Sequence, residues 1–136
     1  MLRIRAGFTL LELLVVVVII GLLASYVGPR YFSQLGRSEV QAARAQMRAL
    51  AQGIEQFRID TGRFPSTGEG LAALQTAPPG VAGWRGPYLR QAVPVDPWGN
   101  AYRYRSPADG NDFEIVSLGN DGQPGGAQDA ADLTAY

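Results

Sequence analysis

The sequence predicts an α+β fold in which one long N-terminal helix packs on a small antiparallel β-sheet. Three observations predict it: an apolar run near the N-terminus, a following stretch with apolar residues at helical spacing, and a last third in which prolines and glycines bracket two short strand-like runs. A chain of 136 residues has room for one small domain and one anchoring segment.

The apolar run covers residues 8–27 and reads FTLLELLVVVVIIGLLASYV, with Glu12 as its only charged residue. A helix of this length extends about 30 Å at about 1.5 Å per residue, which is enough to cross the hydrocarbon of a bilayer. Arg3 and Arg5 precede the run, and basic residues favour the cytoplasmic side. We therefore expect a transmembrane helix over residues 8–29 that crosses the membrane once, with the N-terminus in the cytoplasm.

The carboxylate of Glu12 is costly inside such a run, by about 2.5 to 3.5 kcal/mol at a helix centre and less near an end. A secretory signal peptide or a simple signal anchor is the plainest interpretation of a basic start followed by apolar residues, but neither needs this carboxylate. If residues 1–7 were removed, Phe8 would carry a free amino group. The amine of a neighbouring subunit could then pair with Glu12.

Residues Gly7 to Glu12, in the order G-F-T-L-L-E, resemble the processing motif of type IV pilins and pseudopilins. The resemblance implies that residues 1–7 are a leader peptide, and that a prepilin peptidase cuts after Gly7 and methylates the amine of Phe8. It implies that Glu12 pairs with the N-terminus of an adjacent subunit. It also implies a type IV pilin-like fold whose apolar half-helix becomes the core of a filament.

A second helical stretch follows Pro29 and extends to about Asp60. Its apolar residues recur at spacings of three and four, which predicts one apolar face made of Val40, Ala43, Met47, Leu50, Ile54 and Phe57. Packing on the chain's own domain is favoured over a coiled-coil seam, because the stripe is short. Since Gly28-Pro29 kinks or interrupts a helix, we expect one long helix with a bend, or alternatively two helices. Residues 30–136 then form a globular domain that includes the amphipathic helix 30–60.

Capping and turn signals predict the remaining elements. Ser66 and Glu69 form a capping-box pattern, which predicts a short helix near residues 67–75. The runs 101–105 and 112–118 lie between turn signals and predict an antiparallel hairpin. Tyr88 and Trp98 lie beside prolines, and we assign them structural roles rather than contacts with a ligand.

Three later segments narrow the resemblance: TGRFPSTGEGLAAL, PVDPWGNAYRYRS and FEIVSLGNDGQPGG occur in this order. They resemble the major pseudopilins of the bacterial type II secretion system, the general secretion pathway protein G family. This implies a structural subunit of a periplasmic filament, assembled from the inner membrane, that helps to drive folded proteins through the outer-membrane secretin. The implied partners are further copies of the chain, minor pseudopilins, the prepilin peptidase, the inner-membrane assembly platform and, before assembly, membrane lipid. A type IV pilus subunit and a membrane-anchored periplasmic binding module are the alternatives.

The C-terminal end is locally acidic, with six carboxylates after the last arginine, Arg105. Glycines accompany them, and calcium binds to carboxylate and carbonyl oxygens presented by such curled segments. On composition alone a solvated acidic loop is favoured over a cation site, because the spacing is not that of an EF-hand. The resemblance to major pseudopilins implies a calcium ion held by the carbonyl of Leu118 and by Asp121 and Asp132. Asp129 would replace a family aspartate, because Ala130 occupies its usual position.

Composition excludes most other functions. The chain has no histidine and no cysteine, so the commonest general base, thiol nucleophiles, thiolate metal sites and disulfides are all absent. Basic and acidic residues number 12 each, which gives no excess charge for binding nucleic acid. We expect no enzymatic activity and no nucleic-acid partner.

Overall fold

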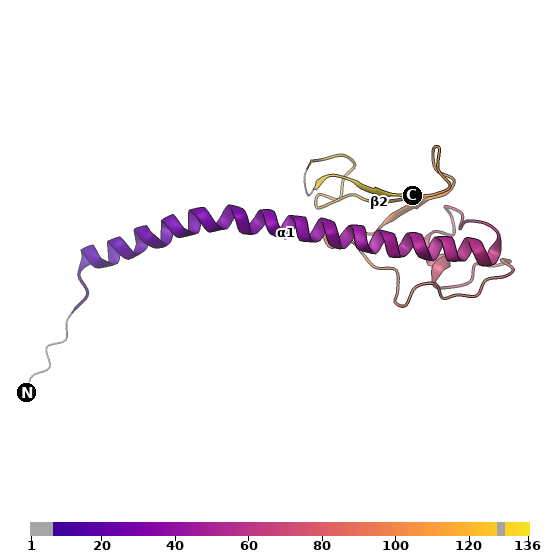
Figure 1. The fold of residues 1–136 in the computed structure, drawn as a ribbon, viewed down its shortest axis with the longest axis horizontal. Helices are drawn as coiled ribbons and strands as arrows, with labels where there is room; N and C mark the ends of the chain where they lie inside the picture. Colours follow the sequence, from indigo (N-terminus) through magenta and orange to yellow (C-terminus); the bar gives the residue numbers. More distant parts are fainter. Residues whose placement is uncertain (1–6, 128–129) are drawn as a thin grey trace, which may run out of the picture. The chain divides into compact units, whose positions relative to one another are not determined.

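The structure is a computed structural model that describes residues 7–127 and 130–136. It contains one α-helix, α1 (Leu10–Thr61), a short 3₁₀ helix, η1 (Leu71–Leu74), and three strands, β1 (Arg103–Arg105), β2 (Glu114–Ser117) and β3 (Leu133–Ala135) (Figure 1). The chain divides into two units, the first ending at Gly36 and the second running from Arg37 to Tyr136. Helix α1 contributes to both.

Helix α1 has 52 residues and continues through Pro29, so the alternative of two separate helices is wrong. The helix ends where Gly62, at φ 77°, donates its N–H to the carbonyl of Arg58 at 2.8 Å. Glycine adopts this left-handed conformation without a steric cost, which makes it a common helix terminator.

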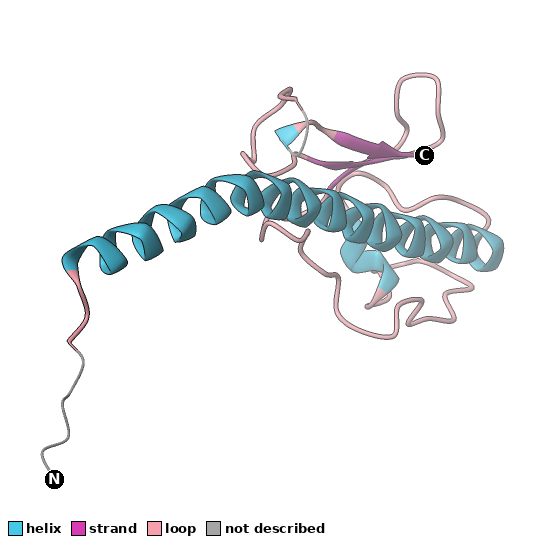
Figure 2. Ribbon diagram, turned by 60° about the vertical axis from the view of Figure 1, so that its left-hand side comes forward, coloured by secondary structure: helices cyan, strands magenta, loops and turns pink. Residues whose placement is uncertain are grey.

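The strands form one antiparallel sheet in the order β1-β2-β3, drawn in magenta in Figure 2. Tyr104, Ile115 and Ala135 are paired across it, so their side chains share one face. Ile115 is fully buried at the centre of this row, whereas the opposite face carries the exposed Arg103 and Thr134. The predicted hairpin corresponds to β1 and β2 and is confirmed. Strand β3 completes the sheet and was not identified as a separate strand from the sequence.

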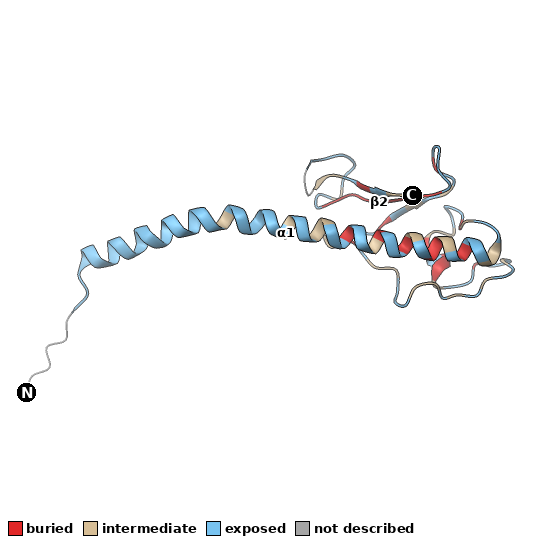
Figure 3. Ribbon diagram, in the orientation of Figure 1, coloured by how far each residue is buried: buried red, intermediate tan, exposed pale blue. Residues whose placement is uncertain are grey.

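The core of the second unit lies between the C-terminal half of α1 and the sheet. The predicted apolar face of the helix supplies its buried residues, coloured red in Figure 3: Ala43, Met47, Leu50, Ile54 and Phe57 are each at most 2% exposed. The predicted packing of this face on the chain's own domain is therefore confirmed. The arrangement of a long helix on a small antiparallel sheet agrees with the predicted α+β, pilin-like fold.

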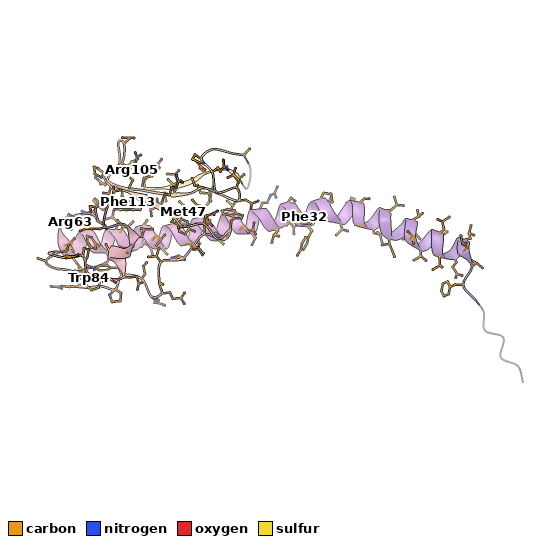
Figure 4. The ribbon with its side chains drawn as sticks, turned by 180° about the vertical axis from the view of Figure 1, so that it is seen from behind. Phe32, Met47, Arg63, Trp84, Arg105 and Phe113 are labelled. Atoms are coloured by element: carbon orange, nitrogen blue, oxygen red, sulfur yellow. The ribbon has the colours of Figure 1, made fainter. Side chains whose placement is uncertain are left out.

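The segment between α1 and β1 covers the other side of the helix, where Trp84 is labelled in Figure 4. The predicted capping box is present, with Ser66 N–H donating to Glu69 Oε2 at 2.7 Å and Glu69 N–H donating to Ser66 Oγ at 3.3 Å. The helix that follows is a single 3₁₀ turn, shorter than predicted. Tyr88 packs edge to face on Phe57, with ring centroids 5.9 Å apart, in the structural role expected of it.

Candidate functional sites

The segment around the predicted cleavage site precedes helix α1. Gly7, Phe8 and Thr9 are exposed and lie outside regular structure. Thr9 Oγ1 accepts a hydrogen bond from the N–H of Glu12 at 3.2 Å, which satisfies one of the free donors of the first turn. The Gly7–Phe8 peptide bond is therefore separated from the helix by a capping residue. Residues 1–6 of the predicted leader lie outside the described residues.

Glu12 occupies the first turn of α1. Its position three residues after the capping threonine matches a capping box, and a negative charge there is favoured by the positive end of the helix dipole. The ion pairs recorded within residues 7–127 and 130–136 involve Arg58, Arg63 and Arg105, and none includes Glu12. Its carboxylate is exposed and available to a group from another molecule.

The apolar half of α1 has no cover within its own unit. The helix contains a stretch long and apolar enough to cross a membrane, and that stretch is 0% buried. Leu10, Leu14 and Ile20 are 85%, 56% and 59% exposed, so large side chains point outward all around the helix. An all-round apolar helix is stable in water only when other apolar groups surround it. Lipid or neighbouring helices must therefore cover this half.

The C-terminal loop between β2 and β3 contains the predicted cation ligands. Leu118 is 6% exposed, and the chain then turns through Gly119 at φ 66° and Gly122 at φ 65°. Asp121 Oδ1 accepts the N–H of Gln123 at 3.1 Å. Later in the loop, Asp132 Oδ2 accepts the N–H of Gly125 at 2.9 Å.

Among the predicted calcium ligands, those that the structure describes have side chains suited to a hard cation. Asp121 and Asp132 belong to one loop, each uses one oxygen for a backbone hydrogen bond, and neither is in an ion pair recorded within the described residues. Carboxylate and carbonyl oxygens are the donors that calcium prefers. Asp129 lies outside the described residues. Within residues 7–127 and 130–136, no group of three or more histidine, cysteine, aspartate or glutamate side chains lies close enough together to hold a metal ion.

A buried carboxylate ties this loop to the domain, and the sequence did not identify it. Asp96 is 2% exposed; its Oδ1 accepts the N–H of Asn100 at 2.7 Å and that of Trp98 at 3.2 Å, and its Oδ2 accepts the hydroxyl of Ser117 at 2.7 Å. Asn100 in turn donates Nδ2–H to the carbonyl of Gly119 at 3.1 Å. The turn signal Asp-Pro-Trp-Gly-Asn could have indicated Asp96, because aspartate side chains often bond the backbone N–H two residues on.

The same network reaches helix α1. Trp98 Nε1–H donates to Glu39 Oε2 at 3.0 Å, and the hydroxyl of Tyr102 donates to Gln46. Burial, together with the negative charge of Asp96, raises the pKa of Tyr102 to about 12. The hydroxyl of Tyr102 therefore stays protonated, and the helix, the 96–100 turn and the start of the C-terminal loop are held together by polar contacts.

Comparisons with known proteins agree with these features. The family described as type II secretion system (T2SS), protein G, matches residues 30–136, and the prokaryotic N-terminal methylation motif matches residues 2–27. The type II secretion system core protein G of Xanthomonas campestris pv. campestris is 42% identical over 129 residues, which cover 95% of this chain and 88% of the relative. That of Pseudomonas aeruginosa is 39% identical over 134 residues, covering 96% and 94%.

Solved structures give the same result. The crystal structure of the major pseudopilin from the type 2 secretion system of enterohaemorrhagic Escherichia coli superposes with a TM-score of 0.65 at 30% identity, covering 76% of this chain and 90% of that one.

Proposed function

This chain belongs to the protein G family of the type II secretion system, the major pseudopilins, and on that premise we propose how its residues act in processing and assembly. It is a structural subunit and not an enzyme. Membership of the family with a methylation motif implies processing by a prepilin peptidase, assembly into a pilus-like filament and anchorage in the inner membrane. The observation that carries the proposal is the fully exposed apolar half of α1 directly after the G-F-T-L-L-E motif.

The peptidase cuts between Gly7 and Phe8 on the cytoplasmic side and methylates the amine of Phe8. The exposed, non-helical conformation of Gly7 to Thr9 supports this, because the bond can enter an active site without unwinding the helix. Mass spectrometry of the membrane-bound chain should find methylated Phe8 as its N-terminus. A mature chain starting elsewhere, or retaining residues 1–7 in the presence of the peptidase, would exclude the proposal.

Glu12 pairs with the amine of Phe8 in an adjacent subunit, and this pairing sets the register of the helices in the filament core. The exposure of the carboxylate and its place in the first turn support the role. A buried charge is well suited to specify register, because a shifted neighbour leaves it unpaired. The assembled filament then helps to move folded proteins from the periplasm through the outer-membrane secretin, with minor pseudopilins and the inner-membrane platform as partners.

Two variants of Glu12 separate pairing from helix capping. Glutamine keeps the capping-box geometry but removes the charge, whereas alanine removes both. If pairing is the role, both Glu12→Gln and Glu12→Ala are processed and inserted normally, and both fail to form filaments that can be sheared from cells. Filaments at the normal level from Glu12→Gln would reduce Glu12 to a capping residue.

Calcium binds to the C-terminal loop through the carbonyl of Leu118 and the carboxylates of Asp121 and Asp132, with Asp129 as a further ligand. When bound, the ion neutralises these charges and joins the two ends of the loop. Because it binds only the folded form, it stabilises the domain by mass action. A loop rich in glycine gains little from burial of apolar surface, so it depends on such a ligand to become ordered.

The melting temperature of a soluble fragment of residues 30–136 tests the calcium proposal. Calcium should raise it, and a chelator should reverse the effect. Asp121→Asn and Asp132→Asn should each weaken the response, while Asp112→Asn, an exposed carboxylate outside the loop, should respond as the parent does. If calcium leaves the melting temperature of the parent fragment unchanged, the proposed site is refuted.

A further inference from the structure

We propose that residues 25–32 of α1 form an interfacial anchor that binds the phospholipid headgroup layer on the outer side of the membrane and sets the depth of the unassembled subunit. The proposal rests on the membrane-spanning role of the preceding apolar segment. Residues 25–32 lie at the end of the predicted membrane-spanning segment, before the core of the globular domain, and the proposal gives this stretch a binding partner.

The first observation is a group of exposed aromatic side chains around a single cation. Tyr26, Tyr31 and Phe32 are 63%, 65% and 72% exposed, and Figure 4 shows Phe32 standing out from the helix. The guanidinium of Arg30 lies 4.8 Å from the ring centroid of Tyr26, and the rings of Tyr31 and Phe32 meet edge to face at 6.0 Å. Amphipathic rings and arginine heads are the side chains that gather at the level of lipid headgroups.

The second observation concerns a backbone carbonyl. Pro29 lies inside α1 and has no N–H, so the carbonyl of Ser25, four residues earlier, loses its usual helical partner. The nearby hydroxyls of Ser25 and Ser33 donate to other carbonyls, those of Leu22 at 2.8 Å and Arg30 at 3.0 Å. A carbonyl without a partner is costly in hydrocarbon but is readily hydrated among headgroups. The hydrocarbon boundary should therefore lie close to Ser25.

The distances along the helix agree with this boundary. Helix α1 rises about 24 Å over the sixteen steps from Leu10 to Tyr26, at about 1.5 Å per residue. Phe8 and Thr9 precede the helix and add to this length, which brings it close to the thickness of the hydrocarbon layer. With Tyr26 at the outer boundary, Phe8 lies at the inner boundary, where the peptidase acts, and Glu12 lies deeper, in the first turn of the helix. The anchor would thus hold the processing site at the cytoplasmic surface.

Charge favours lipid over a second copy as the partner of this segment. Arg30 is the only charged residue between Glu12 and Arg37, so α1 offers no carboxylate within a turn of it. A neighbouring copy shifted by the four residues that separate Phe8 from Glu12 would likewise bring no carboxylate within a turn of Arg30. A phosphate of the outer leaflet supplies the missing negative charge, and the guanidinium can bind it through two donors.

The absence of cysteine allows a direct test on the full chain. Single cysteines at Leu23, Ala24, Val27, Gly28 and Gln34 are labelled with a membrane-impermeant maleimide in nanodiscs of phosphatidylethanolamine and phosphatidylglycerol, loaded with one chain per disc. Protection should end between Ala24 and Gly28. The same scan is repeated in a triple variant that combines Arg30→Ser, Tyr31→Ser and Phe32→Ser. The control variant combines Ser33→Ala with Gln34→Ala, and its scan omits the cysteine at position 34.

In the triple variant the boundary should move toward the C-terminus by about one turn, roughly four residues, because Glu12 then draws the helix toward the cytoplasmic surface. The control should leave the boundary in place. A boundary that the triple variant does not move would overturn the proposal. Protection of residues 27 to 34 that appears only with several chains per disc would instead assign the segment to helix contacts. One more single cysteine, at Val17 in the middle of the apolar stretch, detects a different failure, because its labelling would refute the membrane span itself.

Discussion

Replacing Asp96 with alanine tests whether one buried carboxylate holds the 96–100 turn and the start of the C-terminal loop on the domain. The substitution leaves the N–H of Asn100, the N–H of Trp98 and the hydroxyl of Ser117 without their acceptor. Two of the three lost hydrogen bonds are short, at 2.7 Å. Because Asp96 is only 2% exposed, water cannot readily replace the lost acceptor oxygens.

The magnitude follows from these contacts. A hydrogen bond to a charged group contributes about 1.5 to 3 kcal/mol, so the two short bonds correspond to about 3 to 6 kcal/mol. Removing the carboxylate also relieves its desolvation, which offsets part of that loss. We expect Asp96→Ala to lower the free energy of unfolding by about 3 kcal/mol. Asp96→Asn should cost about 1 kcal/mol, because its amide oxygen still accepts from the backbone and the Ser117 hydroxyl can rotate to accept.

Urea denaturation of the fragment 30–136, followed by circular dichroism with a chelator present, measures these costs without a contribution from a bound ion. The exposed Asp112→Ala is the control and should change stability by less than about 0.5 kcal/mol. Ser117→Ala combined with Asp96→Ala should cost less than the sum of the two single variants, because they share a bond. Equal costs for Asp96→Asn and Asp96→Ala, or an alanine cost below about 1 kcal/mol, would refute the reasoning.

Three further predictions concern the same fragment. Paired hydrogen bonds from Arg63 lower the pKa of Glu69 to about 2. The stability that these bonds contribute is present above about pH 4.5 and is lost as the pH falls toward 2. The loss should be about 1 kcal/mol after allowance for solvent screening. In Glu69→Gln, the melting temperature should depend less on pH in this range, and an unchanged dependence would contradict the prediction. Ile54→Ala should cost about 2 to 5 kcal/mol in urea denaturation, because the side chain is fully buried; a cost below about 1 kcal/mol would show that the site collapses. Gly83→Ala should destabilise markedly by the same measurement, since Gly83 has φ 82° and an added methyl group would meet the carbonyl of Asp60; an unchanged midpoint would show that the loop moves aside.

The sequence predicted the helical part of the fold well because its signals are local. Apolar spacing identified the buried face of α1, since burial on one side of a helix depends on positions three and four residues apart. The capping pattern at Ser66 and Glu69 was also correct, because both partners lie within one turn.

Features that join distant segments were not predictable in the same way. Strand β3 has three residues, and its pairing with β2 depends on a partner sixteen residues away, between Ser117 and Leu133. The role of Asp96 likewise depends on Ser117, which lies 21 residues later and is brought close to it only in the folded domain. The resemblance to major pseudopilins, rather than the acidic and glycine composition, made the C-terminal loop a predicted calcium site, and composition alone does not say which oxygens converge. The ligand set therefore remains a proposal.

The N-terminus of α1 explains why processing and assembly can be separate steps. Thr9 and Glu12 begin the helix after the Gly7–Phe8 bond, so the proposed removal of residues 1–7 leaves the cap intact and requires no refolding. The amine that this proposed cleavage creates on Phe8 is positive and lies beside the positive end of its own helix dipole, which disfavours it there. Glu12 of the same chain is drawn to that dipole from the first turn, but one helix cannot easily fold its terminus back onto the carboxylate. A neighbouring carboxylate at matching depth relieves the amine better than its own helix does. Under the proposed function, the charge created by cleavage therefore favours assembly in one register.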